Sequence, residues 1–512
     1  MMYKFIGVPL LVFLCFGTAQ CQKKNILFFA SDDMRPELGA FLGPDFPSPV
    51  HPTVVHSPNL DALAAQSLLL KRAYVQQAVC SPSRTSLLTG RRPDTTHVYD
   101  LIHYFRNVGG NYTTIPQFFK NNGYRSIGMG KIFHPGRASG FDDPISWSEP
   151  YYHAPDEKFR SVNFSWRAVS KDEYNIRPLP DMQIADNAIQ TLNRVAPAAK
   201  SGQQNFFVAV GFHKPHLPFV FPEEFLSLYP RESIRLPDNP HAPVNMPEIA
   251  WINYITEELG VYHDINRLHA TGAINSTLPD DVVIDLRRAY YSALSYTDSL
   301  VGKVMAELVR LGLANSTIVS FWGDHGWQLG EHGEWCKHTN FEDATHAPMM
   351  VSVPGLTDKG LVTERLTEYV DLFPTLVEAA GFDPLPLCPE DSTTTALCRE
   401  GTSLIPLMQD PTREWKAAVF SQYPRNNYTV MGYTLRTDKY RYTEWPAFTM
   451  SPVYKPDWNK LYGVELYDHS VDPEENYNRF NDPQYQSIVE QLSSQLRKGW
   501  RDMQPPGTIR GH

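Results

Sequence analysis

Short apolar runs alternate along the chain with segments in which apolar residues recur every three or four positions. The first pattern predicts buried strands and the second predicts amphipathic helices. Asn25 to Ala30 predicts a strand, Ser57-Pro58 predicts the start of a helix through Leu70, and Thr85 to Leu88 predicts the start of a helix that ends at Gly90. A longer helix is predicted by Leu286, Ala289, Ala293, Tyr296, Leu300, Val304 and Leu308. This alternation predicts an α/β fold with a mostly parallel sheet between helices.

Four of the apolar runs are followed directly by residues that can do chemistry. They are Ile26 to Ala30 before Asp32-Asp33, Ser126 to Gly130 before Lys131 and His134, Phe206 to Phe212 before His213 and His216, and Ile318 to Trp322 before Asp324-His325. Ligands of open α/β sheets bind beyond the carboxyl ends of the strands. We therefore expect the four segments to converge on one crevice.

Length and charge narrow the class of protein. A chain of 512 residues, 42% hydrophobic and 20% charged, has ample length for a large core and predicts more than one domain. We place a catalytic domain at residues 22–410 and a smaller α+β domain at 411–512. The formal net charge of −10 argues against nucleic acid as a partner, but a local field still permits an anionic substrate.

The first 21 residues have the pattern of a signal peptide. Lys4 provides the positive end, Phe5 to Phe16 is the apolar centre, and small residues follow before Cys21. No later apolar run is long enough to span a bilayer, so we expect a secretory protein that does not bind membranes. Five N-x-Ser/Thr sequons are predicted glycosylation sites: Asn111, Asn163, Asn275, Asn315 and Asn427.

The cysteines fit an oxidising compartment. Cys388 and Cys398 bracket a loop with Pro and Thr and are predicted to form a local disulfide, which leaves Cys80 for modification and Cys336 as an odd thiol. Cys15 departs with the signal peptide, and cleavage on either side of Cys21 is compatible with the sequence.

Three aspartates are candidate metal ligands. Asp32, Asp33 and Asp324 carry hard oxygen donors that suit calcium or magnesium, and carboxylates this close together require a cation. Paired aspartates are also common in turns and helix caps. The second cluster follows an equivalent strand, which favours the metal site.

The segment Cys80-Ser81-Pro82-Ser83-Arg84, continuing through Leu88-Thr89-Gly90-Arg91, resembles the signature of the type I sulfatases. In that family a secretory-pathway enzyme, which reads the positions of Pro82 and Arg84, oxidises the cysteine to formylglycine. One hydroxyl of its hydrate attacks the sulfate ester and the other later expels sulfate. The resemblance implies an alkaline-phosphatase-like fold and one calcium ion. It also implies Cys80 and His325 as further metal ligands, although many sulfatases carry asparagine at the position of His325.

The same resemblance assigns a set of cationic residues: Arg84, Lys131, His134, His216 and Lys337. Arg84 is expected to hold the hydrate and the sulfate charge. Lys131 and His134 would attend the hydrate, with His134 taking the proton that triggers sulfate elimination. His216 and Lys337 would face the ester oxygen, one of them as general acid. The two lysines would otherwise be solvated surface residues, and His213 is expected to be a supporting histidine.

Two further stretches, Gly211 to Phe219 and Asp324 to Trp335, resemble the iduronate 2-sulfatase branch of the family, and Ser421 to Arg436 matches its smaller C-terminal domain. The branch implies removal of the 2-O-sulfate from non-reducing-end iduronate in heparan and dermatan sulfate in the lysosome. Trp327 would stack on the sugar, and Arg436 or Arg441 would pair with its carboxylate; core and structural roles are the alternatives.

The chain departs from that branch in two features, and neither affects the candidate catalytic residues. The loop cleaved during maturation in the branch is short here, near Gln409-Asp410-Pro411, and an earlier family disulfide has no matching cysteines. Two other functions remain open: a phosphate or phosphonate ester hydrolase of the same superfamily, and a secreted glycosaminoglycan-binding protein in which Cys80 stays unoxidised.

Overall fold

The structure is a computed structural model that describes residues 23–42, 55–154 and 163–508. The predicted signal peptide, with Cys15 and Cys21, lies outside the described residues. Within them, no helix has the length and apolar character needed to cross a bilayer.

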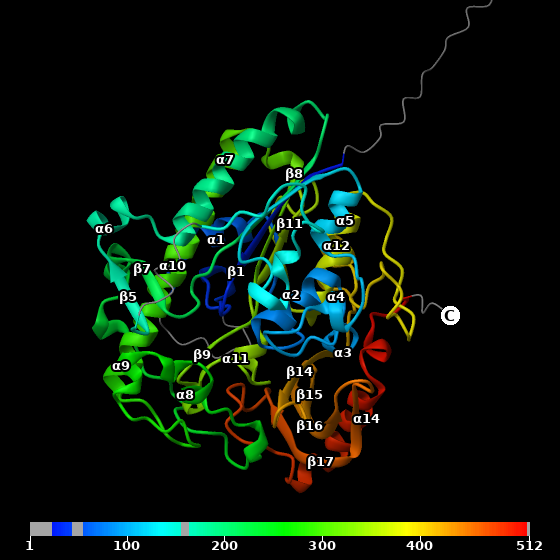
Figure 1. Ribbon diagram of the computed structural model, residues 1–512. Coiled ribbons are helices and arrows are strands. Elements are labelled where there is room, and N and C mark those ends of the chain that lie inside the picture. Colours follow the sequence, from blue (N-terminus) through cyan, green and yellow to red (C-terminus); the bar gives the residue numbers. More distant parts are fainter. Residues whose placement is uncertain (1–22, 43–54, 155–162, 509–512) are drawn as a thin grey trace, which may run out of the picture.

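A seven-stranded sheet forms the centre of the molecule, in the order β12-β2-β11-β8-β1-β6-β4 (Figure 1). The strands are β1 (Asn25–Ser31), β2 (Leu68–Leu70), β4 (Arg125–Gly130), β6 (Phe206–Gly211), β8 (Thr317–Gly323), β11 (Met349–Ser352) and β12 (Leu361–Thr363). β8, β1, β6 and β4 are mutually parallel neighbours, whereas β11 runs antiparallel to both β8 and β2. The four runs that precede the polar clusters are thus adjacent strands, as predicted.

Helices cover both faces of this sheet because the buried strands are apolar on both sides. Leu27 and Phe29 pack with the helices of one face, and Ile26 and Phe28 pack with those of the other. The first group is α1 (Pro58–Ala64), α7 (Pro180–Lys200) and α10 (Asp280–Arg310), and the second is α2 (Cys80–Thr89), α5 (Ile115–Asn121) and α12 (Leu372–Ala379). The long helix predicted from its spacing is α10.

Two predicted helix boundaries were wrong. The helix that begins at Pro58 ends at Ala64, and Leu68–Leu70 instead forms β2, which is buried between β11 and β12. The helix predicted to begin at Thr85 begins five residues earlier, at Cys80. Pro82 is tolerated there because the first N–H groups of a helix have no intrahelical partner. Its end at Gly90, with φ of 65°, was predicted correctly.

A second, antiparallel sheet follows the predicted domain boundary. It consists of β14 (Val419–Arg425), β15 (Val430–Arg436), β16 (Tyr440–Thr449) and β17 (Lys455–Asp468), and α14 (Gln486–Lys498) packs against it. Figure 1 shows this unit below the central sheet. The backbone N–H of Gln422 in β14 donates to the carbonyl of Gln76, 2.8 Å away, which ties this sheet to the segment just before α2.

Cys388 and Cys398 form the predicted disulfide, whereas Cys80 and Cys336 are free and buried. The bond closes a short loop with a sequence separation of 10.

Replacing Cys388 and Cys398 with alanine is expected to lower the free energy of unfolding by about 2–4 kcal/mol, because the unfolded chain regains the conformational entropy of that loop. Chemical denaturation measures the change. An unaltered free energy in the double variant, or an equal loss in Cys336→Ala, would contradict it.

The five predicted glycosylation sites are accessible. The asparagines of all five sequons are exposed: Asn111, Asn163, Asn275, Asn315 and Asn427. Their modification stays a prediction.

Candidate active site

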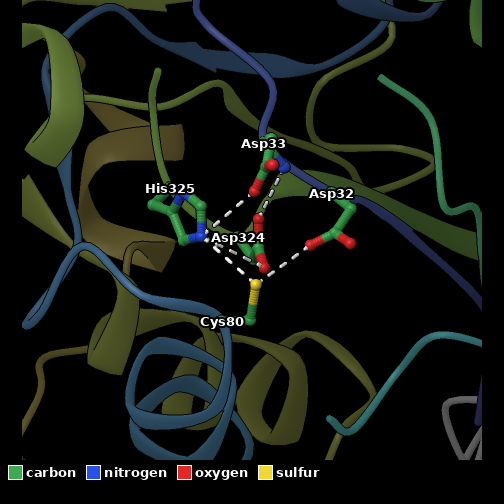
Figure 2. Close-up of side chains that lie close together, drawn as sticks. All are labelled: Asp32, Asp33, Cys80, Asp324 and His325. Atoms are coloured by element: carbon green, nitrogen blue, oxygen red, sulfur yellow. Dashed lines mark hydrogen bonds and ion pairs between the residues drawn. The ribbon is translucent and has the colours of Figure 1, made fainter. Parts of the chain in front are cut away.

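Five predicted metal ligands meet at the carboxyl ends of β1 and β8 and at the first residue of α2. Figure 2 shows Asp32, Asp33, Asp324 and His325 around the thiol of Cys80. One ligand atom from each of the five lies within 4.8 Å of the others. The Cys80 Sγ is 3.5 Å from both Asp32 Oδ1 and His325 Nε2.

The register of the sheet explains this convergence. β1 and β8 are parallel, with Ser31 opposite Gly323, so Asp32-Asp33 and Asp324-His325 follow the two strands at the same level of the sheet. Asp33 has a positive φ of 57°, and its backbone N–H donates to Asp324 Oδ1 at 2.9 Å. The hydrogen bond holds the two turns together across the strand ends.

The Cys80 thiol is a poor nucleophile in its unmodified form. The side chain is buried, and burial together with the negative charge of Asp32 raises its pKa well above the ordinary value of 9.0. A thiol needs to ionise in order to attack, and this environment opposes ionisation. The position therefore suits a residue whose chemistry comes from modification.

Arg84 and two lysines neutralise the carboxylates. Arg84 donates from Nε to Asp324 Oδ2 at 2.9 Å and from Nη2 to Asp32 Oδ1 at 3.0 Å. Lys131 donates to Asp32, and its Nζ is also 3.5 Å from the Cys80 Sγ. Lys337 Nζ lies 3.0 Å from both carboxylate oxygens of Asp33. Both lysines are buried, so they are not solvated surface residues.

A cavity of about 340 Å³ opens beside this cluster, and Asp32, Lys131, His134 and His216 line it. His216 Nε2 lies 3.8 Å from Asp33 Oδ2, and the His216 Nδ1 is hydrogen-bonded to the carbonyl oxygen of Leu217. Burial, with the charge of Lys131, lowers the pKa of His134 to about 3, so its imidazole is neutral near pH 7.

The orientation of His325 leaves one ring nitrogen available for a cation. Its Nδ1 is 2.9 Å from the carbonyl oxygen of Gly326, and a carbonyl only accepts, so Nδ1 carries the hydrogen. The lone pair of Nε2 then faces Asp33 Oδ1 at 3.3 Å and Asp324 Oδ2 at 3.6 Å.

The electrostatics of the three aspartates fit a divalent cation. Burial, with repulsion among the carboxylates, raises the pKa of Asp33 well above its ordinary range despite Lys337, and raises that of Asp324 to about 6 despite Arg84. Burial opposes the charge of Asp32 as well, but Lys131, His216 and Arg84 lower its pKa well below the ordinary value. A hard cation would relieve the repulsion, and carboxylate oxygens are the ligands it prefers.

Glu258, which follows α8 (Tyr254–Glu257), is a site residue that the sequence analysis missed. Its Oε1 lies 3.2 Å from Lys337 Nζ and 3.7 Å from His216 Nε2. Its Oε2 lies 3.3 Å from the Nε2 of His338. Burial opposes its charge, but Lys337 and His338 hold the pKa of this carboxyl well below 4.5. Glu258 follows no apolar strand, so no pattern in the chain singled it out.

Asp181 explains the supporting role of His213. The Asp181 carboxylate accepts from the backbone N–H groups of His213 and Lys214 at about 3 Å, and its Oδ1 lies 3.0 Å from His213 Nδ1. The loop that carries His216 is therefore anchored to the first turn of α7 through a buried carboxylate.

The three residues predicted to contact the sugar are all buried. Trp327 is fully buried in the core, and the Lys337 ammonium lies 4.9 Å from its ring centroid. Arg436 pairs with Glu342 at 2.9 Å, and Arg441 pairs with Glu475 at 2.6 Å, both in buried positions. These contacts are those of core and structural residues, so the structure does not support the sugar-binding prediction.

Comparison with known proteins agrees with this geometry. Residues 24–382 match the sulfatase family, and residues 330–502 match the C-terminal family of N-sulphoglucosamine sulphohydrolase. The chain belongs to the sulfatase family. It is 38% identical to the iduronate 2-sulfatase of Mus musculus over 93% of this chain and 94% of that protein, and 38% identical to that of Homo sapiens over 90% and 92%.

The solved structure of the phosphonate monoester hydrolase of Agrobacterium radiobacter has the same fold. It superposes with a TM-score of 0.68 at 19% identity, covering 94% of this chain and 96% of that one. At that identity the likeness concerns the fold alone.

Proposed function

We propose that this protein removes the 2-O-sulfate from iduronate at the non-reducing end of heparan and dermatan sulfate chains. The observation that supports it best is the buried Cys80, set among three carboxylates and three cationic side chains. The 38% identity to iduronate 2-sulfatases along almost the whole chain supports the choice of sugar.

Each charged side chain has a task in that reaction. Arg84 and Lys131, which both donate hydrogen bonds to Asp32, hold the nucleophile and the sulfate oxygens in place. Preorganised charges of this kind stabilise the charge that develops in the transition state without reorganising water. His134 accepts a proton on the nucleophile side, where its imidazole is neutral. His216 and Lys337 are assigned to the leaving group, and one of them protonates the departing sugar oxygen.

Two groups complete the site. Asp32, Asp33, Asp324 and His325 would hold calcium, and Cys80 would be converted to formylglycine by the formylglycine-generating enzyme of the secretory pathway. The cation supplies charge that neutralises sulfate, and the formylglycine hydrate supplies a nucleophile with a second hydroxyl for its release. We place the protein in that pathway, either lysosomal or secreted.

The test is turnover of a defined disaccharide that carries 2-sulfated iduronate at its non-reducing end. We expect release of one sulfate per disaccharide, with less activity on a small aryl sulfate. Preference for a phosphonate monoester would replace the proposal with the alternative hydrolase. Binding without release, together with an unmodified Cys80 in peptide mass spectra, would identify a glycosaminoglycan-binding protein.

Glu258→Gln is expected to lower kcat about tenfold to a hundredfold, equivalent to about 1.4–2.7 kcal/mol. Glutamine keeps the shape of the side chain but removes the charge that holds Lys337 and His216 in position. KM for the anionic substrate should not rise, because a negative charge is lost. The exposed neighbour provides the control, Glu257→Gln, which should behave as the unaltered protein. An unaltered kcat in Glu258→Gln would exclude this positioning role.

A further inference from the structure

A hydrogen-bonded network connects the C-terminal sheet with the candidate active site. The His338 Nδ1 lies 2.6 Å from the hydroxyl oxygen of Tyr423 on β14, and the His338 Nε2 lies 3.3 Å from Glu258 Oε2. Glu258 Oε1 in turn lies 3.2 Å from Lys337 Nζ. The network therefore runs from the antiparallel sheet to one of the two cationic residues assigned to the leaving group.

The positions of the hydrogens in this network follow from the carboxylate. Burial opposes the charge of Glu258, but Lys337 and His338 hold the pKa of its carboxyl well below 4.5, so it is an acceptor. His338 Nε2 therefore carries the hydrogen that it shares with Glu258. In the neutral imidazole Nδ1 is then an acceptor, and the Tyr423 hydroxyl donates to it. Burial raises the pKa of Tyr423, so the hydroxyl retains its hydrogen. All these hydrogen bonds donate toward Glu258.

The outer part of the network is shielded from water. Tyr423 and His338 are each 8% exposed, and they are not among the described residues that line the active-site cavity. In a shielded position a hydrogen bond is stronger than in water, and leaving one partner without the other is unfavourable. Either side chain would act on the reaction through Glu258, because neither lines the cavity beside the metal ligands.

The backbone on both sides of Lys337 is held in an unfavourable conformation. Cys336 has a φ of 72° and His338 a φ of 77°, in the left-handed region that residues with a Cβ seldom adopt. Such conformations persist where the surrounding structure fixes them. The backbone N–H of His338 donates to the carbonyl of Ala78, 3.2 Å away. His338 is therefore fixed at its backbone and at its ring, directly beside Lys337.

A carboxylate that orients catalytic groups needs to be fixed itself, because a small displacement of such groups lowers the rate. We propose that Tyr423 and His338 are positioning residues that hold the Glu258 carboxylate in place. Through that carboxylate they align the two cationic residues assigned to the leaving group. The C-terminal sheet thereby contributes to protonation of the departing sugar oxygen. The role in protonation rests on the function proposed above, but the hydrogen-bonded network does not.

The dependence on the leaving group separates positioning from a general structural role. His338→Leu should lower kcat for the 2-sulfated disaccharide about tenfold to a hundredfold, and Tyr423→Phe about threefold, as for hydrogen bonds to a charged and to a neutral group. Both should leave kcat for 4-nitrophenyl sulfate within about twofold, because 4-nitrophenolate departs without being protonated. Equal losses on the two esters in both variants would overturn the positioning role.

Tyr442→Phe is the matched control for these measurements. Tyr442 is a buried tyrosine of the same sheet, and its hydroxyl donates to Glu444 Oε1 at 2.9 Å. The control should hydrolyse both esters as the unaltered protein does. A loss in Tyr442→Phe equal to that in Tyr423→Phe would assign the effect to the sheet as a whole and would overturn the role of Tyr423.

A double variant tests whether His338 acts through Glu258. Residues of one hydrogen-bonded network have effects that do not add. Adding His338→Leu to Glu258→Gln should therefore lower kcat for the disaccharide by no more than about a further twofold. If the double variant instead shows the product of the two separate losses, His338 acts independently of Glu258 and the proposal fails.

Crystal structures decide the network without any turnover. In His338→Leu the Glu258 carboxylate should move away from Lys337, whereas Tyr442→Phe should keep the contact of 3.2 Å. An unmoved carboxylate in His338→Leu would overturn the positioning role. If the unaltered protein hydrolyses neither ester, the proposed function fails, while this comparison still decides whether His338 holds the carboxylate.

Discussion

Cys80→Ser is expected to abolish sustained turnover and to leave at most one sulfate on each enzyme molecule. Serine has one hydroxyl, so it can attack the sulfate ester but has no second hydroxyl with which to expel sulfate. The position is 2% exposed, so water has little access to the resulting ester. Steady-state assays should show a loss of several orders of magnitude, and intact-protein mass spectrometry after incubation with substrate should show the added mass of one sulfate group.

Cys336→Ser is the matched control, because Cys336 is the other free, buried cysteine among the described residues. It should retain turnover and acquire no sulfate. Continued turnover by Cys80→Ser would exclude formylglycine as the nucleophile. A Cys80→Ser protein that neither turns over nor acquires sulfate would place the defect in binding or folding, which substrate titration and circular dichroism would separate.

The sequence was most informative where structure depends on neighbouring residues. The apolar run from Asn25 to Ala30 forms most of β1. The apolar residues that recur every three or four positions around Leu300 lie in the long helix α10. Leu68–Leu70 was misassigned because three consecutive leucines fit a buried helix as well as a strand. Only the pairing with β11 and β12, which comes from distant parts of the chain, makes them a strand.

The convergence of the candidate site residues was predictable from the topology of parallel strands. Parallel strands bring their carboxyl ends to one edge, so the residues after β1, β4, β6 and β8 were expected to meet there. Glu258 was not predictable, because it lies among short helices far from any strand. The sugar contacts were also uncertain from sequence, since an aromatic or arginine motif does not reveal burial: Trp327 and Arg441 are in the interior.

Asp324→Asn is expected to lower activity by about a thousandfold or more, because the substitution removes one of the three carboxylates that we propose hold the cation. Asp324 also accepts from Arg84 Nε and from the Asp33 N–H, so the variant should weaken calcium binding and disturb Arg84, the residue that we propose holds sulfate. A loss of this size, about 4 kcal/mol, is typical of removing a principal electrostatic element from an active site. Calcium per chain, measured by elemental analysis at a concentration that saturates the unaltered protein, should fall with the activity.

Asp298→Asn separates this effect from general destabilisation. Asp298 is a buried aspartate of α10 that accepts from the side chain of Asn59 and the backbone N–H of Leu60, and it is not one of the five residues of the cluster. We expect it to change stability without changing calcium content. Excess calcium should partly restore Asp324→Asn, because mass action compensates a weakened site but does not repair a damaged fold. Full activity and full calcium content in Asp324→Asn would remove the carboxylate from the metal site, and failure of excess calcium to restore any activity would assign its main effect to Arg84.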